Sequence, residues 1–101
     1  MGFRGKHERM RRFSKRVRHR EDFRLVDTSG VVGFGFEAEY KGLNLLGFSC
    51  DEEDGPVSVF FHPEIKQCEI DLTALRKLLD DVEAELFQRR REWQAMPPLE
   101  E

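Results

Sequence analysis

The fold is decided by residues 31–50, which read VVGFGFEAEYKGLNLLGFSC. In the first half of this stretch, apolar residues alternate with glycine or glutamate, and this period of two is that of a half-buried strand. The residues on the apolar face are Val32, Phe34, Phe36, Ala38 and Tyr40. Lys41 and Gly42 predict a tight turn, because glycine accepts the positive φ that such turns need. Residues 43–50 then return as a second strand, so the stretch predicts an antiparallel hairpin.

Shorter strands are expected on both sides of this hairpin. Residues 23–26 precede it and end at a polar turn over residues 27–30. Residues 57–62 follow it as a third strand of the meander, which Pro63 ends. We also consider residues 67–70 as a further edge strand.

From Asp71 the apolar period changes to that of a helix. The predicted buried stripe comprises Leu72, Leu75, Leu79, Val82, Leu86 and Trp93, widened by Leu78 and Phe87. Asp71 is a suitable N-cap, and the pair Pro97–Pro98 stops the helix. At about 1.5 Å per residue the helix is roughly 30 Å long, more than a small sheet needs. We therefore expect its last turns, around Phe87 and Trp93, to project beyond the sheet.

These elements predict an α+β fold in a chain of 101 residues, which is the length of one domain. We expect a small antiparallel β-meander of three to five strands, with a long C-terminal α-helix packed on one face. The predicted organisation is a basic N-terminal arm over residues 1–22, a single domain over 23–96 and a C-terminal tail over 97–101.

Charge is divided unevenly along the chain. Residues 1–24 hold ten Lys or Arg against three acidic residues, a balance of +7, whereas the rest holds seven basic and seventeen acidic residues, a balance of −10. The arm has Met10, Phe13 and Val17 at helical spacing. We consider a short amphipathic helix there, ordered against an acidic surface such as the chain's own body, because crowded like charges weaken an isolated helix.

Composition excludes several classes of protein. With 39% hydrophobic and 37% charged residues, the chain has the composition of a globular protein. No apolar run approaches the roughly 20 residues of a membrane span, and no apolar segment of a secretion signal follows the first basic residues. Two cysteines without an export signal favour reduced thiols, so we expect a cytoplasmic protein.

Residues 32–36, Val-Gly-Phe-Gly-Phe, resemble the aromatic RNA-binding motif of RRM domains and, more closely, of cold-shock domains. In cold-shock domains a Val-Phe-Val-His strand follows, to which residues 59–62, Val-Phe-Phe-His, are similar. The resemblance implies rings that stack on unpaired bases. Val32 stands where a basic residue is expected, and a whole strand separates the two segments. We therefore interpret Phe34 and Phe36 as core residues.

The expected order of elements also resembles that of double-stranded RNA-binding domains. That family has lysines at the start of its last helix, where this chain has Asp71, Leu72 and Thr73, followed by Arg76 and Lys77. The resemblance is therefore one of topology, which does not imply function.

The sequence contains no constellation typical of catalysis. Cys50, His62 and Cys68 are the only candidates for a zinc site, but they lack the close Cys-x-x-Cys pair that such sites use. No Gly-x-Ser-x-Gly elbow surrounds Ser49 or Ser58. We expect no enzyme activity, no cofactor and no metal.

The leading hypothesis is a small cytosolic regulator or inhibitor that occupies a protein partner, as accessory proteins of phages and mobile elements do. Its contacts would come from the acidic body and the projecting helix, with Trp93 as the anchor. The expected contact residues are Phe87, Trp93, Asp80, Asp81 and Glu85.

The alternative hypothesis is nucleic-acid binding, in which the arm neutralises phosphates. The contacts would be Arg9, Arg11, Arg12, Lys15, Arg16, Arg18 and Arg20. A homodimer formed through the helix stripe is a third possibility.

Overall fold

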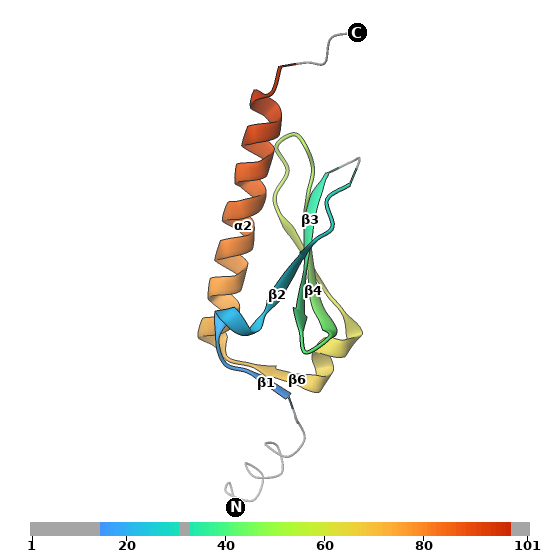
Figure 1. The fold of residues 1–101 in the computed structure, drawn as a ribbon, viewed down its shortest axis with the longest axis vertical. Coiled ribbons are helices and arrows are strands. Elements are labelled where there is room, and N and C mark those ends of the chain that lie inside the picture. Colours follow the sequence, from blue (N-terminus) through green and yellow to red (C-terminus); the bar gives the residue numbers. More distant parts are fainter. Residues whose placement is uncertain (1–14, 31–32, 98–101) are drawn as a thin grey trace, which may run out of the picture.

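The computed structural model describes residues 15–30 and 33–97 (Figure 1). In chain order the elements are β1 (Lys15–Val17), the 3-10 helix η1 (Arg20–Asp22), β2 (Arg24–Asp27), β3 (Phe34–Tyr40), β4 (Leu43–Cys50), β5 (Ser58–Phe61), the 3-10 helix η2 (Pro63–Gln67), β6 (Cys68–Ile70) and α2 (Leu72–Ala95). Their order confirms the predicted α+β class, with an antiparallel meander followed by one long C-terminal helix.

The main sheet has four strands in the order β2-β3-β4-β5, each antiparallel to its neighbour. Lys41 and Gly42 join β3 to β4 with φ values of 50° and 82°, the pair of positive angles that suits a two-residue hairpin turn. A bulge lies in this hairpin, because Ala38 pairs with Leu46 but Glu39 pairs with Asn44. Leu45 is the extra residue, and both it and Leu46 are fully buried.

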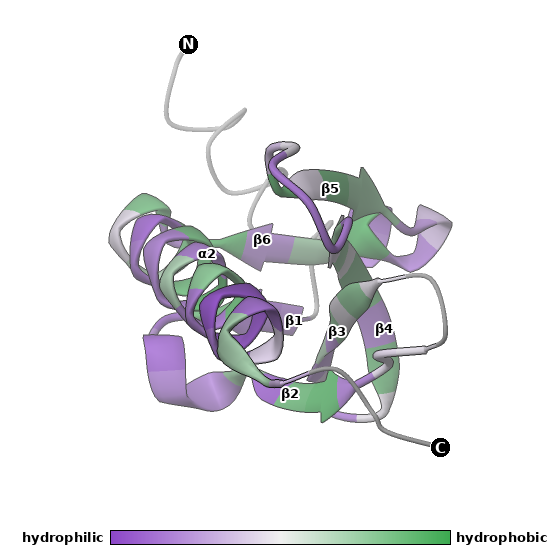
Figure 2. Ribbon diagram, turned by 90° about the horizontal axis from the view of Figure 1, so that it is seen from above, coloured by the Kyte–Doolittle hydropathy of each residue, from purple (hydrophilic) through white to green (hydrophobic). Residues whose placement is uncertain are grey.

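The helix α2 covers one face of this sheet (Figure 2). It buries Ala74, Leu78, Val82 and Leu86. Phe36, Ala38, Leu46 and Phe48 from β3 and β4 belong to the same core cluster as the last three of these. The predicted stripe is partly wrong, since Leu72 is 58% exposed and Leu79 36%. The buried residues are spaced by four and form a ridge inclined to the helix axis, which combines Leu78, Val82 and Leu86 of the predicted set with Ala74.

The strand β6 does not extend the meander, contrary to one of our expectations. It pairs in parallel with β1, with Val17 opposite Ile70. Val17 is fully buried, its carbonyl accepts the Asp71 amide at 2.9 Å, and the Tyr40 hydroxyl donates to the Arg16 carbonyl at 3.2 Å.

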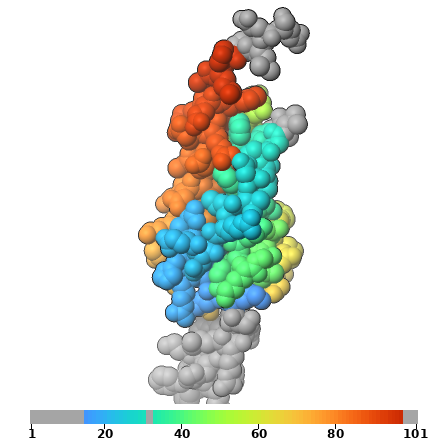
Figure 3. Space-filling model, in the orientation of Figure 1, coloured from blue at the N-terminus to red at the C-terminus, as the bar shows by residue number. Residues whose placement is uncertain are grey.

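The helix considered for the arm is therefore wrong for residues 15–17, which form a strand because Val17 fills the core. Residues 15–22 belong to the folded unit, and η1 packs against α2 (Figure 3). The rest of the arm, including Arg9, Arg11 and Arg12, lies outside the described residues. Within the described ranges, no helix has the length and apolar character needed to span a membrane.

We predict that Val17→Ala lowers the free energy of unfolding of the full chain by about 2 kcal/mol, because it removes two fully buried methyl groups and the cavity closes only in part. Arg18→Ala is the matched control at the next residue, which is exposed, and should change stability by less than about 0.5 kcal/mol. Urea denaturation measures both. Equal, small effects would show that β1 does not contribute to the core.

Candidate protein-binding edge of the sheet

The strand β5 forms one edge of the main sheet and carries exposed apolar side chains on both faces. Val59 is 43% exposed, Phe60 60% and Phe61 55%. In Figure 2 this strand lies at the rim of the sheet. Val59 and Phe61 are on the same face as Phe48 and Leu46, and Phe60 is on the opposite face. Large apolar groups gathered on one short strand mark an interaction surface more often than single exposed residues do.

Within residues 15–30 and 33–97, no backbone hydrogen bond satisfies the outer side of β5. The His62 amide donates to the Leu45 carbonyl at 3.0 Å, which shows that His62 directs its polar backbone groups toward β4. Because these groups alternate along an antiparallel strand, Phe60 also directs its amide and carbonyl toward β4, whereas Val59 and Phe61 direct theirs away. Within the described part of the chain, β4 is the only strand paired with β5. We call Val59, Phe60 and Phe61, with these four outward groups, the β5 edge.

The β5 edge is short but carries neither charge nor proline, which commonly protect an edge strand. Soluble proteins commonly block such edges with lysine, proline or a bulge. Residues 57–61 contain no charged residue, and the nearest prolines, Pro56 and Pro63, stand outside the strand. Among the residues that the structure describes, no existing bond would have to break for a further strand to pair with this edge.

The sheet face turned away from α2, which we call the open face, carries a polar pair beside this edge. His62 Nε2 lies 2.7 Å from Glu37 Oε1, and the His62 and Phe60 rings meet edge to face at 5.0 Å. Gly47 lies between the two polar residues, and a Cβ there would collide with the Glu37 carboxylate. The pair holds His62 in place next to Phe60.

Two serines lie close to this pair. Ser49 and Ser58 line the same shallow hollow of about 450 Å³. No hydrogen bond joins either hydroxyl to His62 among the residues that the structure describes. A nucleophilic serine needs that bond to be activated.

The two cysteines are buried and free of disulfide bonds. Burial raises the pKa of the Cys50 thiol and likewise that of Cys68. A protonated thiol is a poor nucleophile and a poor metal ligand. Across residues 15–30 and 33–97, no three His, Cys, Asp or Glu side chains form a group that could hold a metal ion, so Cys50, His62 and Cys68 are not brought together as one site.

The last turn of α2 lies beyond the ends of the strands, as expected (Figure 1), but several side chains near it contact the sheet or the loop between β4 and β5. The Trp93 ring meets Phe34 edge to face at 6.4 Å. Arg90 Nη1 donates to the Gly55 carbonyl at 2.7 Å, and Gln94 Nε2 donates to the Glu53 carbonyl at 2.6 Å. The loop between β4 and β5 supplies the partners of Arg90 and Gln94, and β3 supplies that of Trp93.

The expected contact residues of the helix do not form one surface. Phe87 is partly buried, with the Arg90 guanidinium 4.9 Å from the centre of its ring, whereas Trp93 is 50% exposed. Asp81 accepts a bond from Arg20 at 2.6 Å, and Glu85 accepts one from Arg89 at 3.2 Å. Asp80 is exposed but lies more than three helical turns before Trp93.

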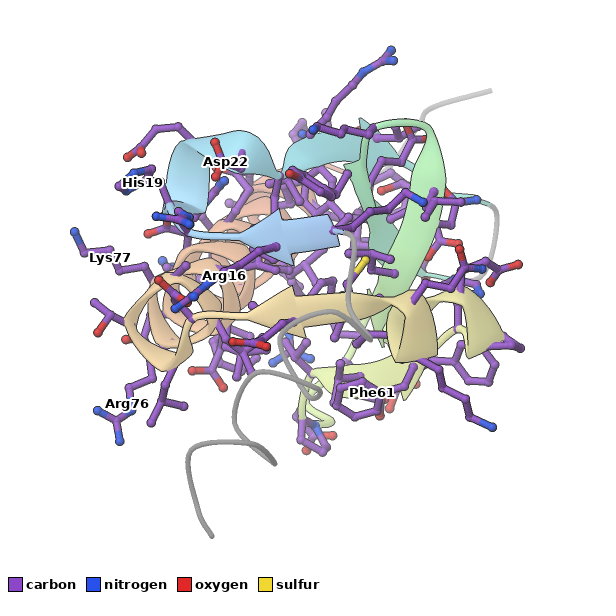
Figure 4. All side chains as sticks on the ribbon, turned by 90° about the horizontal axis from the view of Figure 1, so that it is seen from below. Arg16, His19, Asp22, Phe61, Arg76 and Lys77 are labelled. Carbon is purple, nitrogen blue, oxygen red and sulfur yellow. The ribbon has the colours of Figure 1, made fainter. Side chains whose placement is uncertain are left out.

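Two expected phosphate contacts of the arm bind the chain's own carboxylates instead. Arg16 lies 3.0 Å from Asp71 and 3.8 Å from Glu69, and Arg20 is the partner of Asp81. Lys15 and Arg18 have no ion pair among the described residues. Figure 4 looks onto this end of the molecule, where Arg76 and Lys77 extend from α2 away from the ribbon. The arm's last residues are thus docked on the acidic body.

The Gly-Phe-Gly-Phe stretch serves the core, as we expected for Phe34 and Phe36. Phe36 is 5% exposed, and Phe34 is partly buried against the core. A Cβ on Gly35 would lie 2.7 Å from the Phe48 carbonyl oxygen, so glycine is needed for the close approach of β4. Only the second segment of the resemblance, with Phe60 and His62, lies on the open face.

No protein-family model, curated protein or solved structure matches this chain. The function proposed below is therefore argued from the fold and the surface of the chain alone.

The sequence reasoning missed the β5 edge, although a signal was present. Val59, Phe60 and Phe61 are consecutive apolar residues, so at least one of them had to point away from any single core. The absence of charge from residues 57–61 in a chain with 37% charged residues was the second sign.

We predict an acid-sensitive contact where β2 meets α2. The amide of Ser29 and the guanidinium of Arg89 hold the pKa of Asp27 at about 2, below its ordinary value of 3.8. A lowered pKa stabilises the fold above pH 4, and this stabilisation is lost as the pH falls through about 2. Because the Asp27 side chain is 46% exposed, the effect should stay below about 1 kcal/mol.

Urea denaturation of the full chain and of Asp27→Asn at pH 5, 4, 3 and 2 measures this contribution. The stability of Asp27→Asn should fall less steeply between pH 4 and 2 than that of the natural chain. Parallel pH profiles would mean that Asp27 titrates normally.

Proposed function

We propose that this protein is a small, non-enzymatic cytosolic regulator that occupies a protein partner by accepting one of the partner's strands at the β5 edge. The observation that carries this proposal is the combination of three exposed apolar side chains with the outward amides and carbonyls of Val59 and Phe61. An extended segment added to a sheet edge gains affinity from main-chain hydrogen bonds and specificity from alternate side chains.

The shape of the β5 edge supports an extended peptide over a compact small molecule. Small ligands are usually held in enclosed hollows. The β5 edge is linear, with Val59 and Phe61 on one face and Phe60 on the other. A partner strand with apolar residues at matching positions would cover both faces at once.

The end of α2 is a weaker candidate for the same role. Trp93 and Met96 are 50% and 63% exposed, but the Trp93 ring already contacts the Phe34 ring. The backbone of the helix offers no unpaired groups along its length, so this surface lacks the second kind of contact that the β5 edge provides.

Selection of peptides tests the proposal. We expect a displayed library of random ten-residue peptides, panned on the full chain, to yield sequences that bind the natural protein but lose at least tenfold in affinity for Val59→Pro. Proline removes the outward amide of Val59 and keeps the bonds to β4. Val59→Thr is the matched control, because it keeps the amide and nearly the same shape, and it should bind within about threefold.

The site of binding is read from amide hydrogen exchange. A bound peptide should slow exchange at Val59 and Phe61. Peptides that bind Val59→Pro as well as the natural chain, or that protect the residues around Trp93 instead, would contradict the proposal.

A second candidate function is nucleic-acid binding by the end of the molecule shown in Figure 4. Arg18, Arg76 and Lys77 are exposed there and form no ion pair within the described residues. The sequence of residues 1–14, with five Lys or Arg and one Glu, joins the fold at this end through Lys15. Clustered cations of this kind bind phosphates without reading sequence.

Fluorescence anisotropy over a series of salt concentrations tests this second function. If it holds, the full chain binds labelled single- or double-stranded nucleic acid, and Arg76→Ala with Lys77→Ala lowers the log-log salt slope by about 2. Arg91→Ala, at the other end of α2, should leave the slope unchanged. No binding of the full chain at physiological salt would exclude the function.

A further inference from the structure

We infer that the strand accepted by the β5 edge belongs to a second copy of this chain, so that two β5 strands pair in antiparallel fashion and join two sheets into one. This inference rests on the function proposed above and names the partner of that same edge. It places a two-fold axis at Phe60, with Phe60 of one copy opposite Phe60 of the other.

The outward backbone groups of β5 are self-complementary about Phe60. The residues with outward groups, Val59 and Phe61, lie one position before and one position after it. In an antiparallel pair centred on Phe60, Val59 of each copy faces Phe61 of the other. Each of these two pairs exchanges two hydrogen bonds, so all four outward groups of each copy are satisfied.

The side chains of β5 match in the same register. The central Phe60 pair is of the kind without hydrogen bonds between its members, in which side chains approach most closely, and aromatic rings are favourable there. On the other face, Val59 of one copy packs beside Phe61 of the other. The three exposed apolar side chains of the strand are therefore covered by one contact.

Charge also favours a second copy in this orientation. Residues 57–61 are uncharged, so the two strands do not repel each other. The acidic loop Asp51–Asp54 precedes β5, whereas Lys66 on η2 follows it, with Glu64 and Glu69 near it in the sequence. Antiparallel pairing brings the acidic loop of each copy toward Lys66 of the other.

The area buried by the contact can be compared with that of stable complexes. A buried aromatic side chain hides about 150 to 250 Å². At the exposures given above, the three side chains of both copies together hide roughly 600 Å². Stable complexes bury about 1,200 Å² or more in total. The loop contacts must supply the rest, so we expect a dimer that forms reversibly with concentration.

Disulfide trapping in the full chain tests the register directly. In Phe60→Cys the two new thiols face each other across the axis, about 4.5 Å apart at Cα, which is within the span of a disulfide. Ser58→Cys is the matched control on the same strand and face, but its two copies would lie roughly 13 Å apart along the strand. The native thiols are buried and should not compete. Phe60 is 60% exposed, so its replacement should not unfold the chain.

Under mild oxidation, Phe60→Cys should form a disulfide-linked dimer at least tenfold faster than Ser58→Cys, and adding Val59→Pro should abolish the difference. The natural chain should sediment as a monomer when dilute and as a dimer when concentrated. A natural chain that stays monomeric at high concentration, or equal rates for the two cysteine variants, overturns the second copy as partner. Peptides that protect Val59 would then still support strand addition by another protein, whereas their absence would remove the proposed function as well.

Discussion

One helix is too narrow to cover a sheet of four strands, and this limit shapes the molecule. An α-helix with its side chains is about 10 to 12 Å wide, whereas four strands at about 4.8 Å spacing extend over some 15 to 19 Å. The helix α2 contacts β3 and β4. At the β2 side, η1 packs against the helix and Phe23 joins the core. No described element covers β5 in the same way, so its apolar side chains remain exposed.

Arginine side chains hold both ends of α2 against the rest of the molecule. At its start, Arg16 binds Asp71 and the β1–β6 pair closes the core beneath the sheet. Near its end, Arg89 binds Asp27 and Arg90 binds the loop before β5. These contacts use cations from the basic N-terminal segment and from the last turns of the helix to neutralise nearby carboxylates. In contrast, β5 is uncharged and exposes apolar side chains.

The hairpin and the helix could be predicted from sequence because their signals are local. Alternation over residues 34–40 and the Lys41–Gly42 turn define β3 and β4, and the helical period begins at Asp71. The pairing of β1 with β6 could not be predicted from the sequence. It joins Lys15 to Cys68, which are far apart in the chain, and such a pairing gives no periodic pattern. The buried ridge of α2 and the anchoring of Trp93 depend on the crossing of helix and sheet and on the length of the 51–57 loop. β5 is exposed because no other described element packs over it, and this arrangement is seen only in the assembled fold.

The central claim is that β5 is an unsatisfied edge that a second strand completes. Amide hydrogen exchange of the unmodified full chain at two protein concentrations tests it most directly. We expect the amides of Phe60 and His62, bonded to β4, to exchange slowly at both concentrations. Those of Val59 and Phe61 should exchange fast when the protein is dilute and slow down when it is concentrated. Fast exchange at Val59 and Phe61 at every concentration would contradict pairing with a second copy, and slow exchange in the dilute protein would contradict an open edge.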